Sequence, residues 1–165
     1  MSRFKNLQKQ LGFFTAVSFY RKLKSGNLSN LRTGNLVHQF NLRNNPFDYA
    51  TFEEVILNEA YNIPFGFEPK FIIDGGGNIG LTACFFASKF PAAAIITIEP
   101  DTDNYNLLQL NCKAYANIQT LQCGIWKNDT HLKIENTHAG NNAFTVIETK
   151  EAGADTIKAL TVLSV

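Results

Sequence analysis

The sequence predicts an α/β protein with a parallel core sheet and an added antiparallel ribbon. Strand-like and helix-like patterns alternate over residues 70–126, as in βαβ units. A glycine-rich run follows the first strand of that region directly. Beyond it, strand-like patterns continue with no helix between them. These three observations fix the expected architecture.

The chain of 165 residues is long enough for one domain with a hydrophobic core, and we expect a single domain over residues 1–165. Its apolar fraction of 45% and charged fraction of 18% are those of an ordinary globular protein. Within this domain we distinguish an N-terminal elaboration (1–69), a βαβαβ core (70–126) and a β-ribbon (127–165).

The N-terminal elaboration begins with an expected helix that ends near Ser25-Gly26, where glycine suits a C-terminal cap. Its apolar residues recur three or four apart, which describes one helix face. They are Phe4, Leu7, Leu11, Phe14 and Val17. Basic residues flank the apolar stretch 11–20, so two interpretations stand: a helix packed on the core, or a basic amphipathic helix that contacts a membrane surface or a partner.

Two further elements are expected before the core. Alternating apolar residues over 35–43 predict a strand with Leu36, His38, Phe40 and Leu42 on one face. The series Thr51-Phe52-Glu53-Glu54 has the form of a capping box and predicts a helix over residues 51–61.

The core consists of three expected strands and two helices. The strands cover residues 71–73, 94–98 and 118–123, and the first is a continuous apolar run typical of a strand buried on both faces. One helix covers residues 81–90 before Pro91. The other is capped by Asp101 or Thr102 and turns Tyr105, Leu108 and Cys112 inward. Right-handed crossovers then give a parallel sheet.

The ribbon is expected from three strand-like segments, at residues 131–135, 143–148 and 157–162. The loops 136–142 and 149–155 separate them, with no helical pattern between. Strands joined in this way pair antiparallel.

The loop after the first core strand carries the clearest chemical signal. Residues 75–80 read Gly-Gly-Gly-Asn-Ile-Gly, which satisfies the weak dinucleotide pattern G-x-G-x-x-G. Glycines there allow a sharp turn and the close approach of a ligand. The alternative interpretation is a tight strand-to-helix turn that binds nothing.

Two acids refine the choice of ligand. Asp74 immediately precedes the glycines, where a carboxylate favours a bound ammonium and disfavours a pyrophosphate. Its alternative role is to cap the following helix. Glu99 ends the second core strand, from which a carboxylate can accept hydrogen bonds from ribose hydroxyls in either cofactor class.

The runs FIIDGGGNIG and IITIEPDTDNYNLLQLNCKAYANIQTLQCGIW resemble the FkbM-type family of S-adenosylmethionine (AdoMet) dependent methyltransferases. The resemblance covers roughly residues 40–127. Glu99-Pro100, followed by Asn104 and Leu107-Leu108, is its most diagnostic part. It implies a Rossmann-like methyltransferase fold and AdoMet as the cofactor.

Carried onto this sequence, the resemblance implies that Asp74 and the backbone of Gly75 to Gly77 hold the methionine portion of AdoMet. Glu99 would hold the ribose, and Cys123 with Gly124 would lie beside the adenine. Arg43 and Tyr61 are further candidate contacts. The full expected cofactor-binding set is Asp74, Gly75, Gly76, Gly77, Asn78, Gly80, Glu99, Pro100, Asn104, Cys123 and Gly124. No catalytic residue is assigned.

The sequence departs from the family pattern at its end. It stops at Ser164-Val165, about where the family has a further helix and strand, so we expect the C-terminal strands of the fold to be lacking. The first core strand would then be a sheet edge, through which a homodimer could form.

The resemblance implies methylation of a hydroxyl on a small molecule or sugar. Two alternatives stay open. The G-x-G-x-x-G match allows an NAD(P)-dependent oxidoreductase, and the early stop allows a truncated, non-catalytic fragment that binds AdoMet or a partner.

Other classes are disfavoured by composition. The formal net charge of +1 and the lack of long charge runs argue against a nucleic-acid binder. The three cysteines are dispersed and the three histidines (His38, His131 and His138) are scattered, so we expect neither disulfides nor a metal site. The absence of a disulfide framework predicts a reducing compartment, and we expect a cytoplasmic location. The apolar stretch 11–20 is too short to span a membrane.

Overall fold

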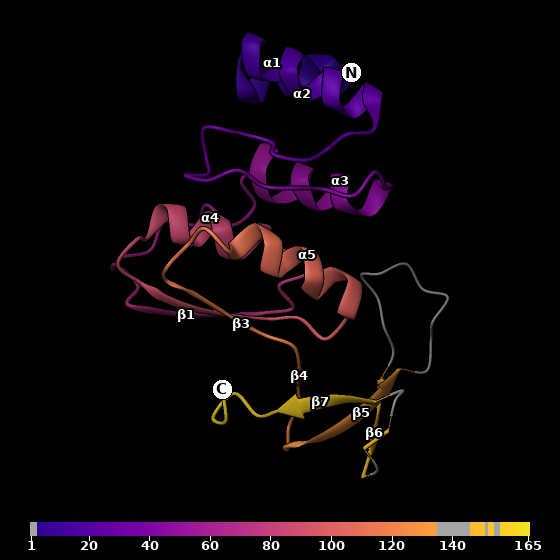
Figure 1. The fold of residues 1–165 in the computed structure, drawn as a ribbon. Helices are drawn as coiled ribbons and strands as arrows, with labels where there is room; N and C mark the ends of the chain where they lie inside the picture. The colour runs from indigo at the N-terminus through magenta and orange to yellow at the C-terminus, as the bar shows by residue number, and fades with distance from the viewer. Residues whose placement is uncertain (1–2, 135–145, 151, 154–155) are drawn as a thin grey trace.

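A computed structural model describes residues 3–134, 146–150, 152–153 and 156–165. Over these residues the chain forms two sheets, with helices gathered along one side of the larger sheet (Figure 1). The loop expected over 136–142, His138, and the first residues of the strand expected from residue 143 lie outside the described residues.

The larger sheet is parallel and three-stranded, in the order β1-β2-β3. It contains β1 (Phe71–Gly75), β2 (Ala94–Ile98) and β3 (Ile118–Leu121). The helices α4 (Leu81–Lys89) and α5 (Thr102–Cys112) connect these strands. This arrangement confirms the predicted α/β class and its parallel core.

One face of this sheet packs on the helices. Ile72, Ile95 and Ile118 share that face and join a large apolar cluster that runs through α4, α5 and the N-terminal segment. Ile96 and Ile98 point to the other face and belong to a separate, smaller cluster with Cys123. The two faces of the sheet therefore belong to two cores of unequal size.

The first core strand is less buried than its apolar sequence predicts. Among the described strands, β1 lies at the edge of the sheet, and its residues are half-buried or exposed. Phe71 is 55% exposed. Ile72 and Ile73, on opposite faces of β1, are only partly buried, so the prediction of a strand buried on both faces is not met. Among the described strands, β1 pairs with β2 alone.

The smaller sheet has the order β4-β7-β5-β6. Its strands are β4 (Gly124–Ile125), β5 (Thr130–Ile134), β6 (Val146–Thr149) and β7 (Thr156–Leu160). β5 pairs antiparallel with both β6 and β7, which confirms the predicted ribbon. β7 also pairs in parallel with β4, because the third expected strand, 118–123, breaks after Leu121 and resumes at Gly124.

The predicted N-terminal helix is two helices. Gly12, with a φ of +77°, separates α1 (Arg3–Leu11) from α2 (Phe13–Ser25). Gly26 caps α2 in a left-handed conformation, as the sequence predicts. Because of the break at Gly12, Phe14 does not continue the buried face of Leu7 and is 86% exposed. Among the described residues, no helix has the length and apolarity to cross a bilayer.

Residues 35–43 do not form the expected strand. Leu36, Phe40 and Leu42 are buried as the alternation indicates, but His38 is exposed. The only ladder contact recorded here is an isolated bridge between Leu31 and Phe40. Side chains replace strand partners: the amides of Val37, His38 and Asn41 donate to Ser88, Tyr115 and Asn111, respectively. The segment is therefore an irregular strap over α4 and α5.

The helix expected to begin at Thr51 begins earlier. The Asn45 side chain accepts a hydrogen bond from the Asp48 amide (2.8 Å), and Pro46 takes the first position of α3 (Pro46–Phe52). α3 continues directly into the π-helical segment η1 (Glu53–Leu57). Thr51 lies inside α3, where its hydroxyl donates to the Phe47 carbonyl, so it is not a cap.

Candidate functional site

The glycine loop joins β1 to α4 through three left-handed positions. Gly76, Asn78 and Gly80 have φ values of +90°, +49° and +83°. Gly80 then serves as the N-cap residue of α4. Glycine accepts this conformation without strain, and asparagine is among the few other residues that do so readily.

The amide groups of this loop are used within the chain. The amides of Gly76 and Gly77 both donate to the Ile98 carbonyl, at 2.9 and 2.8 Å. The amide of Asn78 donates to the Glu99 carboxylate (2.8 Å). Three consecutive N–H groups therefore fasten the loop to the end of β2 and do not point at a ligand.

Gly77 lies where two layers of the core meet. A Cβ atom at this position would collide with the Thr97 hydroxyl and would come within 2.7 Å of Leu108 Cδ1. It would also lie 3.4 Å from the Asp74 carboxylate. Only glycine lets the loop pass over β2 and α5 at this point.

Asp74 lies beneath the loop, on the helix-covered face of the sheet. In the register of the strands it lies opposite Thr97, whose hydroxyl donates to it at 2.8 Å. Burial raises the pKa of Asp74, and the hydrogen bond from Thr97 opposes part of that rise. No cap on the following helix is involved, since Gly80 is the N-cap residue there.

Glu99 connects the loop to α5. It is 5% exposed, and its two oxygens accept hydrogen bonds from the amides of Asn78 (2.8 Å) and Asp101 (2.9 Å). Burial raises the pKa of Glu99, while these amides and the Asn104 side chain lower it. Glu99, which the sequence predicts at the ribose, holds the loop in place.

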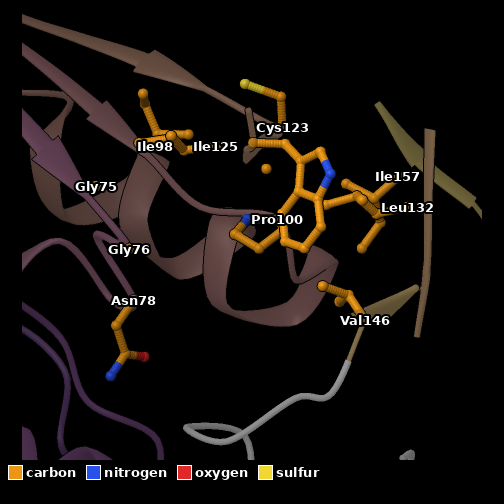
Figure 2. Close-up of a pocket in the computed structure, with 12 residues that line it drawn as sticks. Gly75, Gly76, Asn78, Ile98, Pro100, Cys123, Ile125, Leu132, Val146 and Ile157 are labelled. Atoms are coloured by element: carbon orange, nitrogen blue, oxygen red, sulfur yellow. The ribbon is translucent and has the colours of Figure 1, made fainter. Parts of the chain in front are cut away.

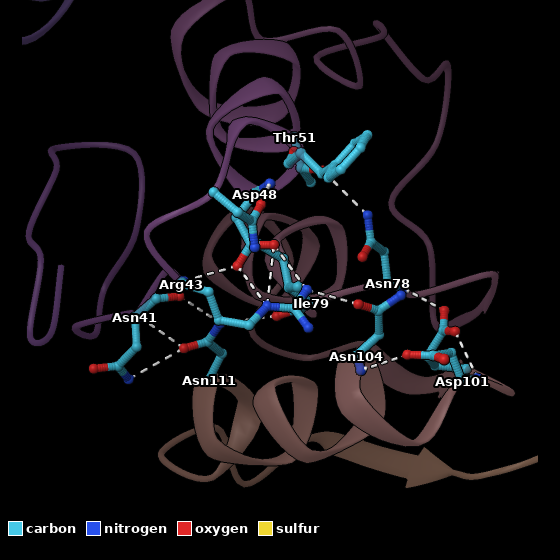
Figure 3. Close-up of polar contacts among 12 residues, drawn as sticks. Asn41, Arg43, Asp48, Thr51, Asn78, Ile79, Asp101, Asn104 and Asn111 are labelled. Carbon is cyan, nitrogen blue, oxygen red and sulfur yellow. Dashed lines mark hydrogen bonds and ion pairs between the residues drawn. The ribbon is translucent and has the colours of Figure 1, made fainter. Parts of the chain in front are cut away.

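A partly buried polar network extends from Asn104 on α5 to the N-terminal segment (Figure 3). Arg43 donates to Asn104 (2.7 Å) and makes a fork-like pair with Asp48, with contacts of 2.7 to 3.2 Å. The hydrogen bond to Asp48 raises the pKa of Arg43. The Asp101 side chain caps α5 by accepting from the Asn104 amide, which confirms the predicted start of this helix. Arg43 is therefore a structural neighbour of the loop.

A cavity of about 430 Å³ opens beyond the loop, between the carboxyl end of β2 and the smaller sheet (Figure 2). Its volume lies in the range of about 300–1,000 Å³ that is usual for small-molecule sites. The expected cofactor residues that line it are Gly75, Gly76, Asn78, Pro100, Cys123 and Gly124. Asp74, Gly77, Gly80, Glu99 and Asn104 are not in its lining.

The sequence reasoning missed the apolar walls of the cavity. They are Ile98, Ile125, Trp126, Leu132, Val146 and Ile157. Trp126 is fixed by its amide, which donates to the Leu160 carbonyl, and by its indole N–H, which donates to Glu148. The one available signal was the position of this sole tryptophan just after the third expected strand.

The remaining candidate residues lie elsewhere. Tyr61 packs edge-on against Phe86 and does not line the cavity, and nor does Arg43. His131 borders a separate hollow with Asp129 and Lys158. Within the described ranges, no three His, Cys, Asp or Glu side chains are grouped as a metal site.

The parallel sheet, the glycine loop at its carboxyl end and the cavity beside that loop define a Rossmann-like fold of the methyltransferase type. Two curated proteins have similar sequences. Methyltransferase 1 of Beauveria bassiana (strain ARSEF 2860) is 29% identical over 85 residues, which are 50% of this chain and 34% of that protein. Methyltransferase sdnD of Sordaria araneosa is 32% identical over 77 residues, 45% of this chain and 30% of that protein.

These similarities support a methyltransferase family for the chain. The chain matches about a third of the length of either relative. No protein-family profile matches it.

Proposed function

We propose that the chain binds AdoMet in the cavity beside the glycine loop and is the cofactor-binding part of an FkbM-type methyltransferase. The observation that carries this proposal is the use of the loop amides. A dinucleotide pyrophosphate needs free N–H donors at such a loop. Here the amides of Gly76 and Gly77 donate to the Ile98 carbonyl. The amide of Asn78 donates to the Glu99 carboxylate. What remains near the loop is the Asp74 carboxylate, which favours a cationic ligand.

AdoMet carries two positive groups, its ammonium and its sulfonium, which suit a site that has a carboxylate close by and no free N–H donors on residues 76–78. The backbone of Gly75 and Gly76 would border the methionine portion. The adenine would lie against Cys123 and Gly124, with Ile125 and Trp126 as apolar contacts. The carboxylate of Asp74 would act on the ammonium from beneath the loop.

The proposed ribose contact of Glu99 fits a carboxylate that keeps acceptor capacity after its two amide contacts. Asn78, which donates to Glu99, and Pro100, which follows it, both line the cavity. Glu99 therefore lies just behind the cavity wall. A ribose hydroxyl would donate to Glu99 either in place of the Asn78 amide or in addition to it.

When bound, AdoMet supplies an electrophilic methyl carbon on its sulfonium. Transfer to an oxygen requires alignment of the acceptor with that carbon, and a base where the hydroxyl is not already ionised. We propose a hydroxyl of a small molecule or sugar as the acceptor, in keeping with the FkbM-type resemblance. His131 borders a different hollow and is not assigned as the base.

Calorimetric titration with AdoMet, S-adenosylhomocysteine and NAD tests the cofactor. We expect the first two to bind and NAD not to bind. Asp74→Asn should weaken AdoMet binding, because it removes a negative charge beneath the loop that would attract the ammonium. Asp103→Asn, which neutralises an exposed acid on α5, is the matched control and should leave affinity unchanged.

Binding of NAD alone, unaffected by Asp74→Asn, would reject the AdoMet site in favour of an oxidoreductase. Binding can be checked independently through stability, because a ligand at 100 times its Kd stabilises the folded state by about 2.7 kcal/mol. Transfer of radiolabelled methyl groups to hydroxylated acceptors then separates a catalyst from a non-catalytic AdoMet-binding fragment.

A further inference from the structure

The helices α1 and α2 form a hairpin at one end of the molecule, which we call the N-terminal hairpin (residues 3–25; Figure 1). Phe4 near its start packs edge-on against Tyr20 near its end, with ring centres 5.4 Å apart, so the two helices fold back on each other at Gly12. Leu7 and Phe19 are buried against the rest of the protein. The hairpin is thus a fixed part of the fold.

Two large aromatic side chains are exposed at the bend of this hairpin. Phe13 is 55% exposed and Phe14 is 86% exposed, and their rings contact each other edge-on at 5.6 Å. Adjacent exposed phenylalanines at the tip of a helical element are costly in water, and such paired exposure marks surfaces that meet an apolar phase.

The N-terminal part of the chain, which contains these aromatics, carries charged residues of one sign. Eight of the 15 Lys and Arg residues fall within residues 1–47, and all 14 Asp and Glu residues follow. The formal net charge of +1 therefore combines +8 on residues 1–47 with −7 on residues 48–165. Arg21 lies two helical turns from Phe14 on the same side of α2, and Lys22 and Arg32 border the same surface hollow as Phe14.

We propose that the N-terminal hairpin docks the protein on an anionic lipid surface. Phe13 and Phe14 enter the interface between headgroups and acyl chains, and the surrounding Lys and Arg side chains contact the headgroups. This combination of exposed aromatics with a basic surface is typical of interfacial helices. Duplex DNA would use the cations alone, since phosphate contacts supply its non-specific affinity and leave the aromatic pair without a role.

The position of the hairpin gives the docked protein an orientation. The hairpin and the smaller sheet, which walls the cavity, lie at opposite ends of the molecule (Figure 1). The cavity would therefore face away from the lipid, and its ligands would arrive from water. This last consequence rests on the proposed function; the docking itself does not.

Co-sedimentation with vesicles tests the docking. The full chain should bind vesicles made of equal parts phosphatidylcholine and phosphatidylserine, should not bind phosphatidylcholine alone, and should be released by salt. Arg21→Gln should weaken binding about fivefold, from about 1 kcal/mol per cation near the surface. Phe14→Ala should weaken it about tenfold through lost apolar burial.

Matched controls are a surface charge and an exposed aromatic outside the hairpin. Lys133→Gln on β5 and Phe67→Ala, a ring that is 69% exposed, should both bind as the unaltered chain does. Thermal unfolding should be the same for all variants, because every altered side chain is exposed.

Tryptophan fluorescence gives a second readout. The single native tryptophan, Trp126, lines the cavity and should not be quenched by brominated acyl chains, whereas the indole introduced by Phe14→Trp should be. Equal binding to both vesicle types, no binding to the mixed vesicles, or unquenched fluorescence of Phe14→Trp on bound protein would overturn the proposal. So would duplex DNA that binds more tightly than the mixed vesicles and is indifferent to Phe14→Ala.

Discussion

At the scale of single residues, the site depends on contacts that leave no space for a side chain. Gly77 passes over Thr97 and Leu108 so closely that a methyl group would meet both. The loop that surrounds it is fixed by hydrogen bonds to the end of β2. A change at Gly77 therefore tests the fold and the cavity together.

Gly77→Ala should lower the free energy of unfolding by about 1–3 kcal/mol, the usual cost of overpacking. It should also weaken ligand binding, because the loop must shift. Gly66→Ala is the control: nothing lies within 4 Å of its Cβ position, so it should be neutral or slightly stabilising. Urea unfolding of both variants measures the difference, and equal midpoints would contradict the packing at Gly77.

Asp74 gives stability a pH dependence of known sign. Burial raises its pKa in the folded protein above the ordinary value of 3.8, so the folded state holds the proton more tightly than the unfolded chain does. Stability is therefore highest below the ordinary value and falls as pH rises from there through the raised pKa. Asp74→Asn should remove this fall and should be more stable than the unaltered chain at neutral pH.

Urea unfolding at a series of pH values checks this prediction. Glu99 also has a raised pKa and contributes a fall of the same sign. The difference between the unaltered chain and Asp74→Asn isolates the contribution of Asp74. Parallel pH curves for the two proteins would show that Asp74 is not buried as a titrating group.

At the scale of elements, Arg43 and Asp48 hold the strap and α3 against α5. The Asp48 carboxylate is 1% exposed, and Arg43 also reaches the side chain of Asn104. Such a pair resists the removal of one partner, because the other charge stays buried without compensation.

Arg43→Ala should therefore destabilise the fold by about 3–5 kcal/mol. Arg43→Lys should recover only part of this, because an ammonium lacks the planar fork. The control is Lys127→Ala, whose exposed pair with Glu148 at 3.7 Å should contribute less than about 1 kcal/mol. Comparable losses for Arg43→Ala and Lys127→Ala would contradict the structural role of the buried pair.

The elements that were predicted correctly are those whose sequence signals lie within a few neighbouring residues. The strand 94–98 is recovered with the same bounds, and the cap at Asp101 is correct, since apolar runs and caps are readable within a few residues. The strap over residues 35–43 could not be predicted. Its amides are satisfied by Ser88, Asn111 and Tyr115, which are distant in sequence.

One side of the cavity could likewise be predicted from the sequence, and the other side could not. Its glycine side follows from a contiguous motif, and Gly75 and Gly76 do line it. Its apolar side comes from Leu132, Val146 and Ile157, which lie on three different strands of the smaller sheet. Ordinary strand residues carry no sign of a ligand in sequence, so only the pairing of those strands reveals them.

At the scale of the whole molecule, β1 leaves one edge of the core sheet unpaired among the described strands. We expect self-association through this edge at high concentration, since an unpaired strand is a template for another chain. Phe71→Lys places a charge on the exposed end of β1 and should reduce the association. Sedimentation velocity over a concentration series measures it, and an unchanged monomer at every concentration would contradict the expectation.

The unequal cores have a consequence for how the molecule opens. The larger cluster spans both core helices and the N-terminal segment, whereas the smaller one buries Ile96, Ile98 and Cys123. Regions with few buried apolar contacts open locally at lower cost than the rest of a protein. Amide hydrogens of β5 and β7 should thus exchange with deuterium faster than those of β2, the central and most buried strand of the larger sheet.

The cavity lies between β2 and the smaller sheet. Its floor on β2 therefore belongs to the slowly exchanging part, and its wall on the smaller sheet belongs to the rapidly exchanging part. A ligand that contacts both would suppress the local opening of the wall. Its arrival should slow deuterium uptake in β5 and β7 far more than in β2. Ligand binding and ordering of the smaller sheet would then be coupled, so the bound molecule would itself stabilise the wall of its site.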